Sequence, residues 1–360
     1  MKRTLLATLI CCAAGAAFAD NTNITMYGLI DMGYSWRGDN YSGALGSRSA
    51  FDSGEFSGTR LGFKGDESLG DGWKAVFTLE AGIAADTGGL NQGGLAWGRQ
   101  SFAGLDKAGW GTATLGRQYT PVRNLYVAAD PFALGSVGRL DNIITPVNPL
   151  NRADNALVLN TPYFGEVFAF EGMYSLNRTG AEATGNVGDT RFWNVVPRVK
   201  FFGDRLRLGA SYSQWKVKNA DHANDMWDVT AIGLIQQITL SAGFSRYDNG
   251  ANDNGTLKLL NGETPKFDRW FVGAKAPVGN FTLMASYAYS KDKSEADLKA
   301  QQIAAGARYA FSNRTSAYTV ASRILANNAA GAYGGYTVTD ASTAGAGYRT
   351  GLNVGMIHQF

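Results

Sequence analysis

The final eleven residues, 350–360, constrain the fold of this chain more than any other segment. One row of alternate residues can lie against hydrocarbon and leads to the terminal aromatic Phe360; it consists of Thr350, Leu352, Val354, Met356 and His358. The other row is largely small or polar and consists of Gly351, Asn353, Gly355, Ile357 and Gln359. A strand of this length and period, ending on an aromatic residue, is more typical of a membrane barrel than of a soluble sandwich. One such strand is a faint signal, so the rest of the chain decides.

The beginning of the chain predicts export. Lys2 and Arg3 form a basic region, and the residues from Thr4 to Phe18 are apolar or small. A small-residue cleavage motif, Ala17-Phe18-Ala19, precedes Asp20, which is the pattern of a signal peptide. The apolar run is shorter than the ~20 residues that a spanning helix needs. We therefore expect residues 1–19 to be cleaved and residues 20–360 to form one domain.

The composition of the mature chain excludes several classes of protein. Cys11 and Cys12 are the only cysteines, and both lie in the signal peptide. A lipoprotein anchor on either fits poorly, because neither follows the usual small residues; without them the mature chain has no disulfides and no thiolate chemistry. Removal of Lys2 and Arg3 from the 33 basic residues leaves 31 against 30 acidic ones. This near-neutral balance gives no support to nucleic-acid binding.

Short segments with alternating apolar and polar residues run along the whole mature chain. No mature segment approaches the length of apolar sequence that a membrane helix requires, and no linker divides the chain. Period-two alternation predicts an all-β fold of sixteen strands, near 24–36, 58–65, 72–83, 95–106, 110–118, 152–160, 164–176, 191–202, 204–216, 227–236, 238–248, 267–276, 280–290, 299–311, 314–324 and 348–360.

The connections between these segments alternate between short and long. Seven are tight, near 66–71, 107–109, 161–163, 203, 236–237, 277–279 and 312–313. Eight are longer and rich in Gly, Asn, Asp and Ser, at 37–57, 84–94, 119–151, 177–190, 217–226, 249–266, 291–298 and 325–347. An up-and-down outer-membrane barrel sorts its connections in this way, with short periplasmic turns and long outer loops. A soluble sandwich has no reason to do so.

Alternation within the strands assigns the two faces of the wall. In the first strand Tyr27, Asp31 and Ser35 lie opposite an apolar row, and in the third Lys74 and Glu80 do the same. A charged row is affordable only where it meets water. About sixteen strands enclose an aqueous channel rather than a packed core. Five tryptophans lie near the ends of predicted strands: Trp36, Trp97, Trp193, Trp227 and Trp270. They can belong to the aromatic girdles of a membrane interface or to ordinary aromatic packing.

The longest connection, 119–151, is unusually apolar for an exposed loop. Its residues Val127–Leu134 can pack against other parts of the protein. We expect this connection to fold into the barrel, with Asp130 and Asp141 as an acidic face; packing on a neighbouring subunit is the alternative.

Arginines recur on the expected lumen side of strands that flank this connection. Arg60, Arg99 and Arg152 each lie opposite outward-facing apolar residues, such as Phe102 for Arg99. Strict alternation would aim Arg117 outward, unless Gly116 bends the strand or the residue lies at the rim. A guanidinium keeps its charge whatever its neighbours. These four residues are the predicted basic wall of a pore, although each can also be an ordinary solvated charge. The other expected lumen charges are Asp31, Lys64, Lys74 and Glu80.

In order along the chain, these segments resemble the general diffusion porins of Gram-negative outer membranes, in particular the beta-proteobacterial branch. The matching segments are Thr25–Asp31, Arg60–Gly65, Arg99–Leu105, Leu115–Tyr119, Arg152–Asn155 and the terminal Phe360. The resemblance implies a homotrimer of 16-stranded antiparallel transmembrane β-barrels in the cell outer membrane, each constricted by its inward-folded third outer loop. Small hydrophilic solutes and inorganic ions would pass, with outer-membrane lipids and lipopolysaccharide around the barrel.

The resemblance also implies roles for single residues. Arg60, Arg99 and Arg152 match the basic constriction wall of the family, and Asp130 matches its acidic loop face. Leu29 stands where some relatives carry a lysine, which leaves open how basic the wall is. Phe360 resembles the signal that outer-membrane assembly machinery reads.

Two rival functions remain to be weighed against a channel. A barrel hydrolase would need a Ser–His pair, but His222 lies in a polar loop and His358 in the outward row of the last strand. Neither has an evident nucleophile, and the sequence contains no cluster of metal ligands. We therefore expect no enzyme activity, no cofactor and no metal. The other rival is a plugged structural or adhesive barrel, which conductance in a planar bilayer distinguishes from a channel.

Overall fold

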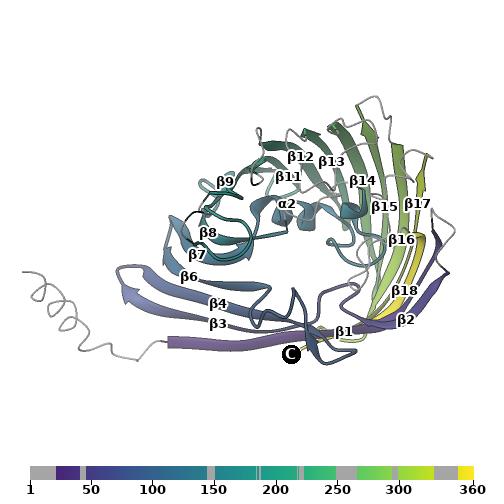
Figure 1. Cartoon of the computed structure of the whole chain (residues 1–360), viewed down its shortest axis with the longest axis horizontal. Helices are drawn as coiled ribbons and strands as arrows, with labels where there is room; N and C mark the ends of the chain where they lie inside the picture. Colours follow the sequence, from purple (N-terminus) through teal and green to yellow (C-terminus); the bar gives the residue numbers. More distant parts are fainter. Residues whose placement is uncertain are drawn as a thin grey trace, which may run out of the picture.

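The computed structural model describes residues 22–40, 46–143, 151–183, 188–216, 223–248, 266–293, 299–327 and 348–360, together with residues 185 and 218. Within these ranges the chain forms a closed barrel of sixteen antiparallel strands, as the sequence predicts. Figure 1 looks along the barrel, so that the strands form a ring. The expected signal peptide, 1–19, and His222 lie outside the described residues.

Sixteen long strands form the wall. They are β1 (Thr22–Asn40), β3 (Arg60–Gly70), β4 (Trp73–Ala84), β6 (Gln100–Lys107), β7 (Gly111–Tyr119), β8 (Arg152–Asn160), β9 (Phe168–Ser175), β10 (Phe192–Phe201), β11 (Leu206–Trp215), β12 (Asn224–Ile235), β13 (Ile238–Asp248), β14 (Lys266–Val278), β15 (Phe281–Asp292), β16 (Lys299–Ala310), β17 (Thr315–Ala326) and β18 (Tyr348–Gln359). Each pairs with its neighbours along the chain, and β1 pairs with β18 from Leu29↔Gln359 to Asn40↔Tyr348, which closes the ring.

Two short strands lie within connections that the sequence analysis left irregular. The first, β2 (Arg48–Ser53), pairs with residues 32–37 of β1, on the same edge that pairs with β3 further along. The second, β5 (Gly89–Leu90), pairs only with Ile83 and Ala84 of β4. Neither adds a member to the ring, because each extends an edge that is already paired.

Several predicted boundaries were wrong. The tight connection placed at 66–71 is strand for most of its length, because β3 continues to Gly70 and the chain turns at Asp71 and Gly72. In addition, β6 begins at Gln100 rather than at residue 95. Arg99 therefore precedes the strand, and Phe102, expected on the outer face, lines an internal cavity.

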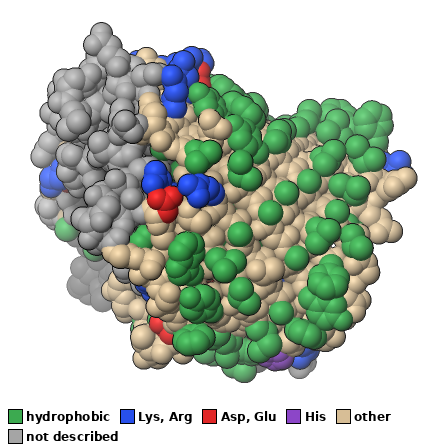
Figure 2. Space-filling model, turned by 90° about the vertical axis from the view of Figure 1, so that its right-hand side faces the viewer, with side chains coloured by type: hydrophobic (Ala, Val, Ile, Leu, Met, Phe, Trp, Pro, Cys, Tyr) green, Lys and Arg blue, Asp and Glu red, His purple; other side chains and the backbone are tan. Residues whose placement is uncertain are grey.

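The two faces of the wall differ as the alternation predicts. On β1, Ile24, Met26 and Ile30 are exposed on the outside, whereas Asp31 and Ser35 are fully buried on the inside. Figure 2 shows the wall that lies on the right of Figure 1, where large hydrophobic side chains spread over the outer surface. An outward apolar band of this kind suits contact with hydrocarbon.

The described part of the longest connection, up to residue 143, is ordered and packed against the barrel. It contains the helix α2 (Pro121–Ala129) and a short 3-10 helix, η1 (Leu140–Asn142). The Tyr126 hydroxyl donates to Asp228 on β12 at 2.6 Å, and the Val137 amide donates to Asn353 on β18 at 2.8 Å. Figure 1 draws α2 within the ring of strands. No helix of the described residues is long and apolar enough to cross a membrane.

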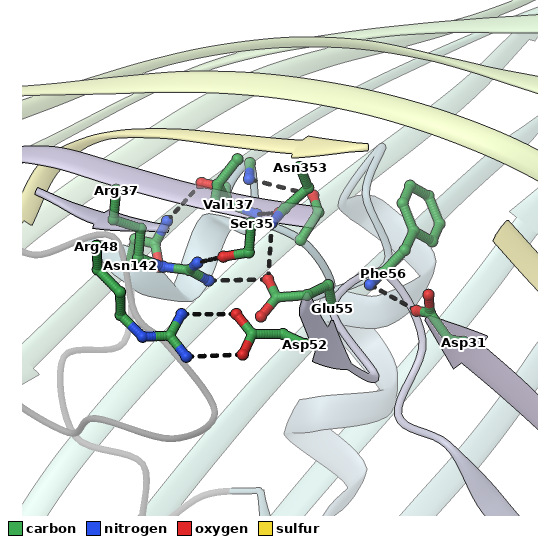
Figure 3. A network of polar contacts seen from close by, with 12 residues as sticks. Asp31, Ser35, Arg37, Arg48, Asp52, Glu55, Phe56, Val137, Asn142 and Asn353 are labelled. Carbon is green, nitrogen blue, oxygen red and sulfur yellow. Dashed lines mark hydrogen bonds and ion pairs between the residues drawn. The ribbon is translucent and has the colours of Figure 1, made fainter. Parts of the chain in front are cut away.

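A second segment, residues 54–59 between β2 and β3, links the long connection to the wall (Figure 3). The Arg37 guanidinium donates to Glu55 at 2.8 Å, and both side chains are almost fully buried. Asn353 donates to the same carboxylate at 2.9 Å and also accepts from Val137. The Ser136 amide donates to the Glu55 carbonyl. The wall, segment 54–59 and the long connection are therefore joined by one polar network.

Candidate functional site

Three arginines from different parts of the chain meet at Tyr119, the last residue of β7. The Tyr119 hydroxyl accepts hydrogen bonds from Arg99 at 2.6 Å and from Arg152 at 2.9 Å. The Arg123 guanidinium carbon lies 3.7 Å from the centre of the Tyr119 ring, and that of Arg152 lies 4.5 Å from it. The segment before β6, the helix α2 and the start of β8 thus converge on one phenol.

One carboxylate, Glu80 on β4, lies beside this cluster. It accepts from Arg99 Nε at 2.7 Å and from the Tyr27 hydroxyl at 3.0 Å. Arg60, the first residue of β3, approaches it to 3.9 Å and donates to the carbonyl of Gly58. Glu80 therefore contacts two of the four guanidinium groups, those of Arg99 and Arg60. We refer to Arg60, Arg99, Arg123, Arg152, Tyr119 and Glu80 as the arginine cluster.

Local structure explains how Arg123 joins the cluster. Thr120 caps α2, since its hydroxyl accepts from the Arg123 amide at 3.3 Å, and Pro121 occupies the first turn, where its missing N–H costs nothing. The helix therefore begins directly after the strand ends. The first turn of α2 thus lies beside the end of β7, and the Arg123 guanidinium stacks on the Tyr119 ring. Sequence reasoning missed Arg123; the Thr-Pro pair was the signal that could have revealed it.

Burial of Arg123 has an electrostatic consequence. Burial, reinforced by the charges of Arg152, Arg99 and Arg60 and opposed by Tyr119, lowers the pKa of Arg123 to about 10. The group still carries its charge at neutral pH. The cluster is therefore a concentration of positive charge that Glu80 offsets only in part.

Arg117, the fourth predicted member of the basic wall, lies apart from the cluster. Its guanidinium forms an ion pair with Asp154 and donates to the Gly98 carbonyl at 2.7 Å. The pairing of β7 with β8 shifts register between Gly116 and Gln118, where two residues of β8 face one of β7. The irregularity that the sequence analysis assigned to Gly116 thus includes an extra residue in β8, and Asn155 there has a positive φ of 51°.

The predicted acidic face is not an open row of carboxylates. Asp130 is fully buried and accepts from the amides of Phe132, Leu134 and Leu140 at 2.9 to 3.1 Å. Its carboxylate closes the turn after α2 rather than meeting a lumen. Asp141 forms an ion pair with Arg139, two residues away. Both acids therefore hold the connection in shape.

The remaining predicted lumen charges have different environments. Asp31 is fully buried and accepts from the Phe56 amide at 2.7 Å and the Tyr318 hydroxyl at 2.7 Å, so it serves the network of Figure 3. Lys64 is exposed and lies 5.6 Å from the Tyr27 ring centre. Lys74 pairs with Asp66 at 3.1 Å at the short-turn end of the barrel. Of the predicted residues, Arg60, Arg99, Arg152 and Glu80 are the ones brought together.

An internal cavity of about 510 Å³ adjoins the cluster on the β1–β9 side of the barrel. Tyr119 and Asn124 of the cluster region line it, with polar residues from several wall strands that include Thr25, Lys64, Asp66, Gln100, Thr114 and Glu171. Glu171 pairs with Arg198 at 3.0 Å and accepts from Asn124. The lining combines these polar residues with apolar ones such as Phe77, Phe102 and Val158, and the cavity lies beside the concentrated positive charge.

Comparison with known proteins indicates the class of protein that the barrel and its polar interior also indicate, a porin. The model of the Gram-negative porin family matches residues 6–329. An outer membrane porin of Bordetella pertussis is 32% identical over 77% of this chain and 73% of its own length. Outer membrane porin protein 32 of Delftia acidovorans is 27% identical over the full length of both chains. The solved anion-selective porin from Comamonas acidovorans superposes with a TM-score of 0.74 at 25% identity, covering 94% of this chain and 100% of that one.

The chain belongs to the Gram-negative porin family. It is an outer-membrane β-barrel that acts as a general diffusion channel, which confirms the fold, location and class of function that the sequence predicts. The described residues contain no group of three or more His, Cys, Asp or Glu side chains that could hold a metal ion.

Proposed function

We propose that this porin is a passive channel that favours anions, and that the arginine cluster sets the preference at a constriction formed by residues 121–143. The observation that carries the proposal is the unequal charge: Arg60, Arg99, Arg123 and Arg152 meet, with Glu80 as the adjoining carboxylate. Rings of fixed charge select ions by sign. The anion-selective porin from Comamonas acidovorans, similar over nearly the whole chain, supports the same conclusion.

Packing supports the placement of the constriction. Leu125, Phe132 and Val137 are buried, and the connection bonds to strands as far apart in the ring as β10, β12, β16 and β18. A segment that reaches such distant parts of a ring narrows the space it crosses. The alternative of packing on a neighbouring subunit does not account for these contacts within one chain.

The test is the zero-current potential of the reconstituted channel in a salt gradient. We expect the parent channel to favour anions, and replacement of the three predicted arginines Arg60, Arg99 and Arg152 with Gln to move the potential towards cation preference. The effect should weaken as salt rises, because charges are screened over ~8 Å at physiological ionic strength. A matched control replaces three exposed arginines away from the cluster, Arg205, Arg246 and Arg314. If both triple variants keep the parent potential, the cluster does not set selectivity.

We also propose the assembly and processing that the family resemblance implies. These are removal of residues 1–19, insertion through the terminal strand, and a homotrimer surrounded by outer-membrane lipids and lipopolysaccharide. Phe360 supports the assembly role because its side chain is exposed while its amide donates to the Gly28 carbonyl at 3.1 Å. Exposed apolar residues such as Met26 and Phe51 offer surface for lipid or a second subunit. Sedimentation of the detergent-solubilised protein distinguishes a trimer from a monomer.

Neither rival function has support of comparable strength. Membership of a family of channels favours a non-enzymatic role. His358 contacts the Thr315 hydroxyl at 2.9 Å near the exposed end of β17, which is the wrong setting for a catalytic pair. A plugged adhesive barrel would show no conductance in the bilayer experiment.

A further inference from the structure

We infer that Tyr119 is the positioning residue of the constriction, whose hydroxyl and ring hold Arg99, Arg123 and Arg152 together. The inference rests on the proposed anion preference and names the group that fixes its geometry. Glu80 contacts Arg99 and, at longer range, Arg60, whereas Tyr119 contacts Arg99, Arg123 and Arg152 through its hydroxyl or its ring.

The arginines need a reason to lie together. Like charges repel, and this repulsion is screened less at a partly buried site than in bulk water. Glu80 offsets this for Arg99 and, at longer range, for Arg60. Within the described ranges, neither Arg123 nor Arg152 forms an ion pair with a carboxylate. For these two, attraction must come from a group other than an acid.

Tyr119 supplies that attraction in two ways. Its hydroxyl accepts from Arg99 and Arg152 at 2.6 and 2.9 Å, and hydrogen bonds to charged donors are among the strong ones. Its ring has the guanidinium carbon of Arg123 at 3.7 Å and that of Arg152 at 4.5 Å from its centre. A cation near an aromatic face is attracted by the quadrupole of the ring. One side chain therefore contacts all three guanidinium groups.

The chain also places the partners of Tyr119 around it by local structure. Arg152 is its direct cross-strand neighbour in the β7–β8 pair. Arg123 lies in the first turn of α2, where the helix dipole disfavours a cation. Stacking on Tyr119 offsets this cost. The position of Arg123 is thus explained by its contact with the phenol rather than by the stability of the helix.

A carboxylate in the place of Tyr119 would gather the same arginines but remove one positive charge from the constriction. A phenol avoids this loss. It follows that the anion preference depends on Tyr119 even though every uncharged substitution there leaves the net charge of the channel unchanged.

The experiment measures the anion-to-cation permeability ratio of full-length Tyr119→Phe and Tyr119→Leu channels in a planar bilayer. Tyr119→Phe keeps the ring and the pore width but loses the hydroxyl that Arg99 and Arg152 contact, so the ratio should fall about twofold through the lost hydrogen bonds. Tyr119→Leu loses the ring face as well, and the ratio should fall further. The control is Tyr163→Leu, which removes a ring that lies under Lys200 at 4.7 Å, outside the cluster.

A double-mutant cycle adds a readout that a structural role alone would not move. Arg123→Gln should lower the ratio in the parent and much less in Tyr119→Leu, because Arg123 loses its position there. An assembled parent that shows no anion preference overturns the proposed function. An anion-favouring parent whose Tyr119→Phe variant keeps the parent ratio overturns the inference about Tyr119. If Tyr119→Leu fails to assemble, the Phe variant alone decides.

Discussion

At the scale of single residues, Asp130 differs most from its predicted role. The sequence predicts a carboxylate that faces the pore, whereas in the structure this carboxylate stabilises a turn. The carboxylate of Asp130 receives three backbone N–H groups, which favour its ionised form, yet burial outweighs them and raises the pKa of Asp130 to about 6. An Asp that looks like a lumen charge in the sequence is therefore a buried acceptor that pins residues 130–140 together. Removal of this carboxylate would lower the free energy of unfolding by about 1 kcal/mol for each backbone N–H left without a partner.

This pKa predicts a pH dependence with a definite sign. The pKa of Asp130 is higher in the folded than in the unfolded chain. The stabilisation that this carboxyl group gives the folded state is therefore fully present below its unfolded pKa near 4, and is lost as pH rises through about 6. Relative to Asp130→Asn, which does not titrate, the free energy of unfolding of the parent should fall by at most about 3 kcal/mol over this pH window. Thermal unfolding of both proteins in detergent from pH 3.5 to 7.5 measures the difference. A constant difference across the window would contradict the assignment.

At the scale of elements, the alternation of apolar and polar residues was sufficient to predict the strands of the wall. It did not predict the short strand in a connection or every strand boundary. The strands predicted at 152–160 and 238–248 have the same bounds in the structure, since period-two patterns report directly on a two-faced wall. β2 was missed because its six residues lie in a polar connection. β3 was ended too early because Asp66 and Glu67 resemble a turn, although charges are tolerated in strands near the water-exposed rim.

The arginine cluster shows the same limit. Arg60 and Arg152 begin strands, so their side could be predicted from alternation. Arg99 was placed on the correct side by a wrong argument, since it precedes its strand and Phe102 faces inward. Arg123 could not be placed, because its contact depends on a helix that starts at Pro121 and turns back over Tyr119. Contacts that cross from one element to another carry no periodic signal.

Deletion of Val127–Leu134 tests the role of the long connection as an element. The deleted residues include Phe132, which is fully buried, and Asp130, which holds the following turn. We expect a higher single-channel conductance from an assembled barrel, because the proposed constriction would lose these residues. The point variant Phe132→Ser, which leaves the length of the connection unchanged, should give a smaller increase. Parent-like conductance of the deletion variant would show that the segment does not narrow the channel.

At the scale of the whole molecule, the barrel depends on the seam where the first and last strands meet. Here β1 and β18 pair over eleven residue pairs, with Gly33 opposite Gly355. The Tyr318 ring on β17 lies across Gly355 and its hydroxyl donates to Asp31 on β1 at 2.7 Å, so the bond spans the closing strand. A Cβ at position 355 would come within 2.5 Å of the Tyr318 hydroxyl and 2.8 Å of the Met32 carbonyl oxygen.

This geometry predicts that Gly355→Val weakens closure of the barrel. The added side chain must displace Tyr318 and thereby break its bond to Asp31, and overpacking of this kind costs about 1–3 kcal/mol before the lost bond is counted. On gels run without boiling, the parent should migrate as a folded species that heating converts to the unfolded chain, and the conversion temperature of Gly355→Val should be lower. Tyr318→Phe, which keeps the ring on Gly355 but removes the hydroxyl, should fall between the two. Gly233→Ala is the matched control, because a Cβ there meets no atom within 4 Å. If Gly355→Val converts at the parent temperature, Tyr318 does not secure the seam, and closure rests on the β1–β18 backbone ladder alone.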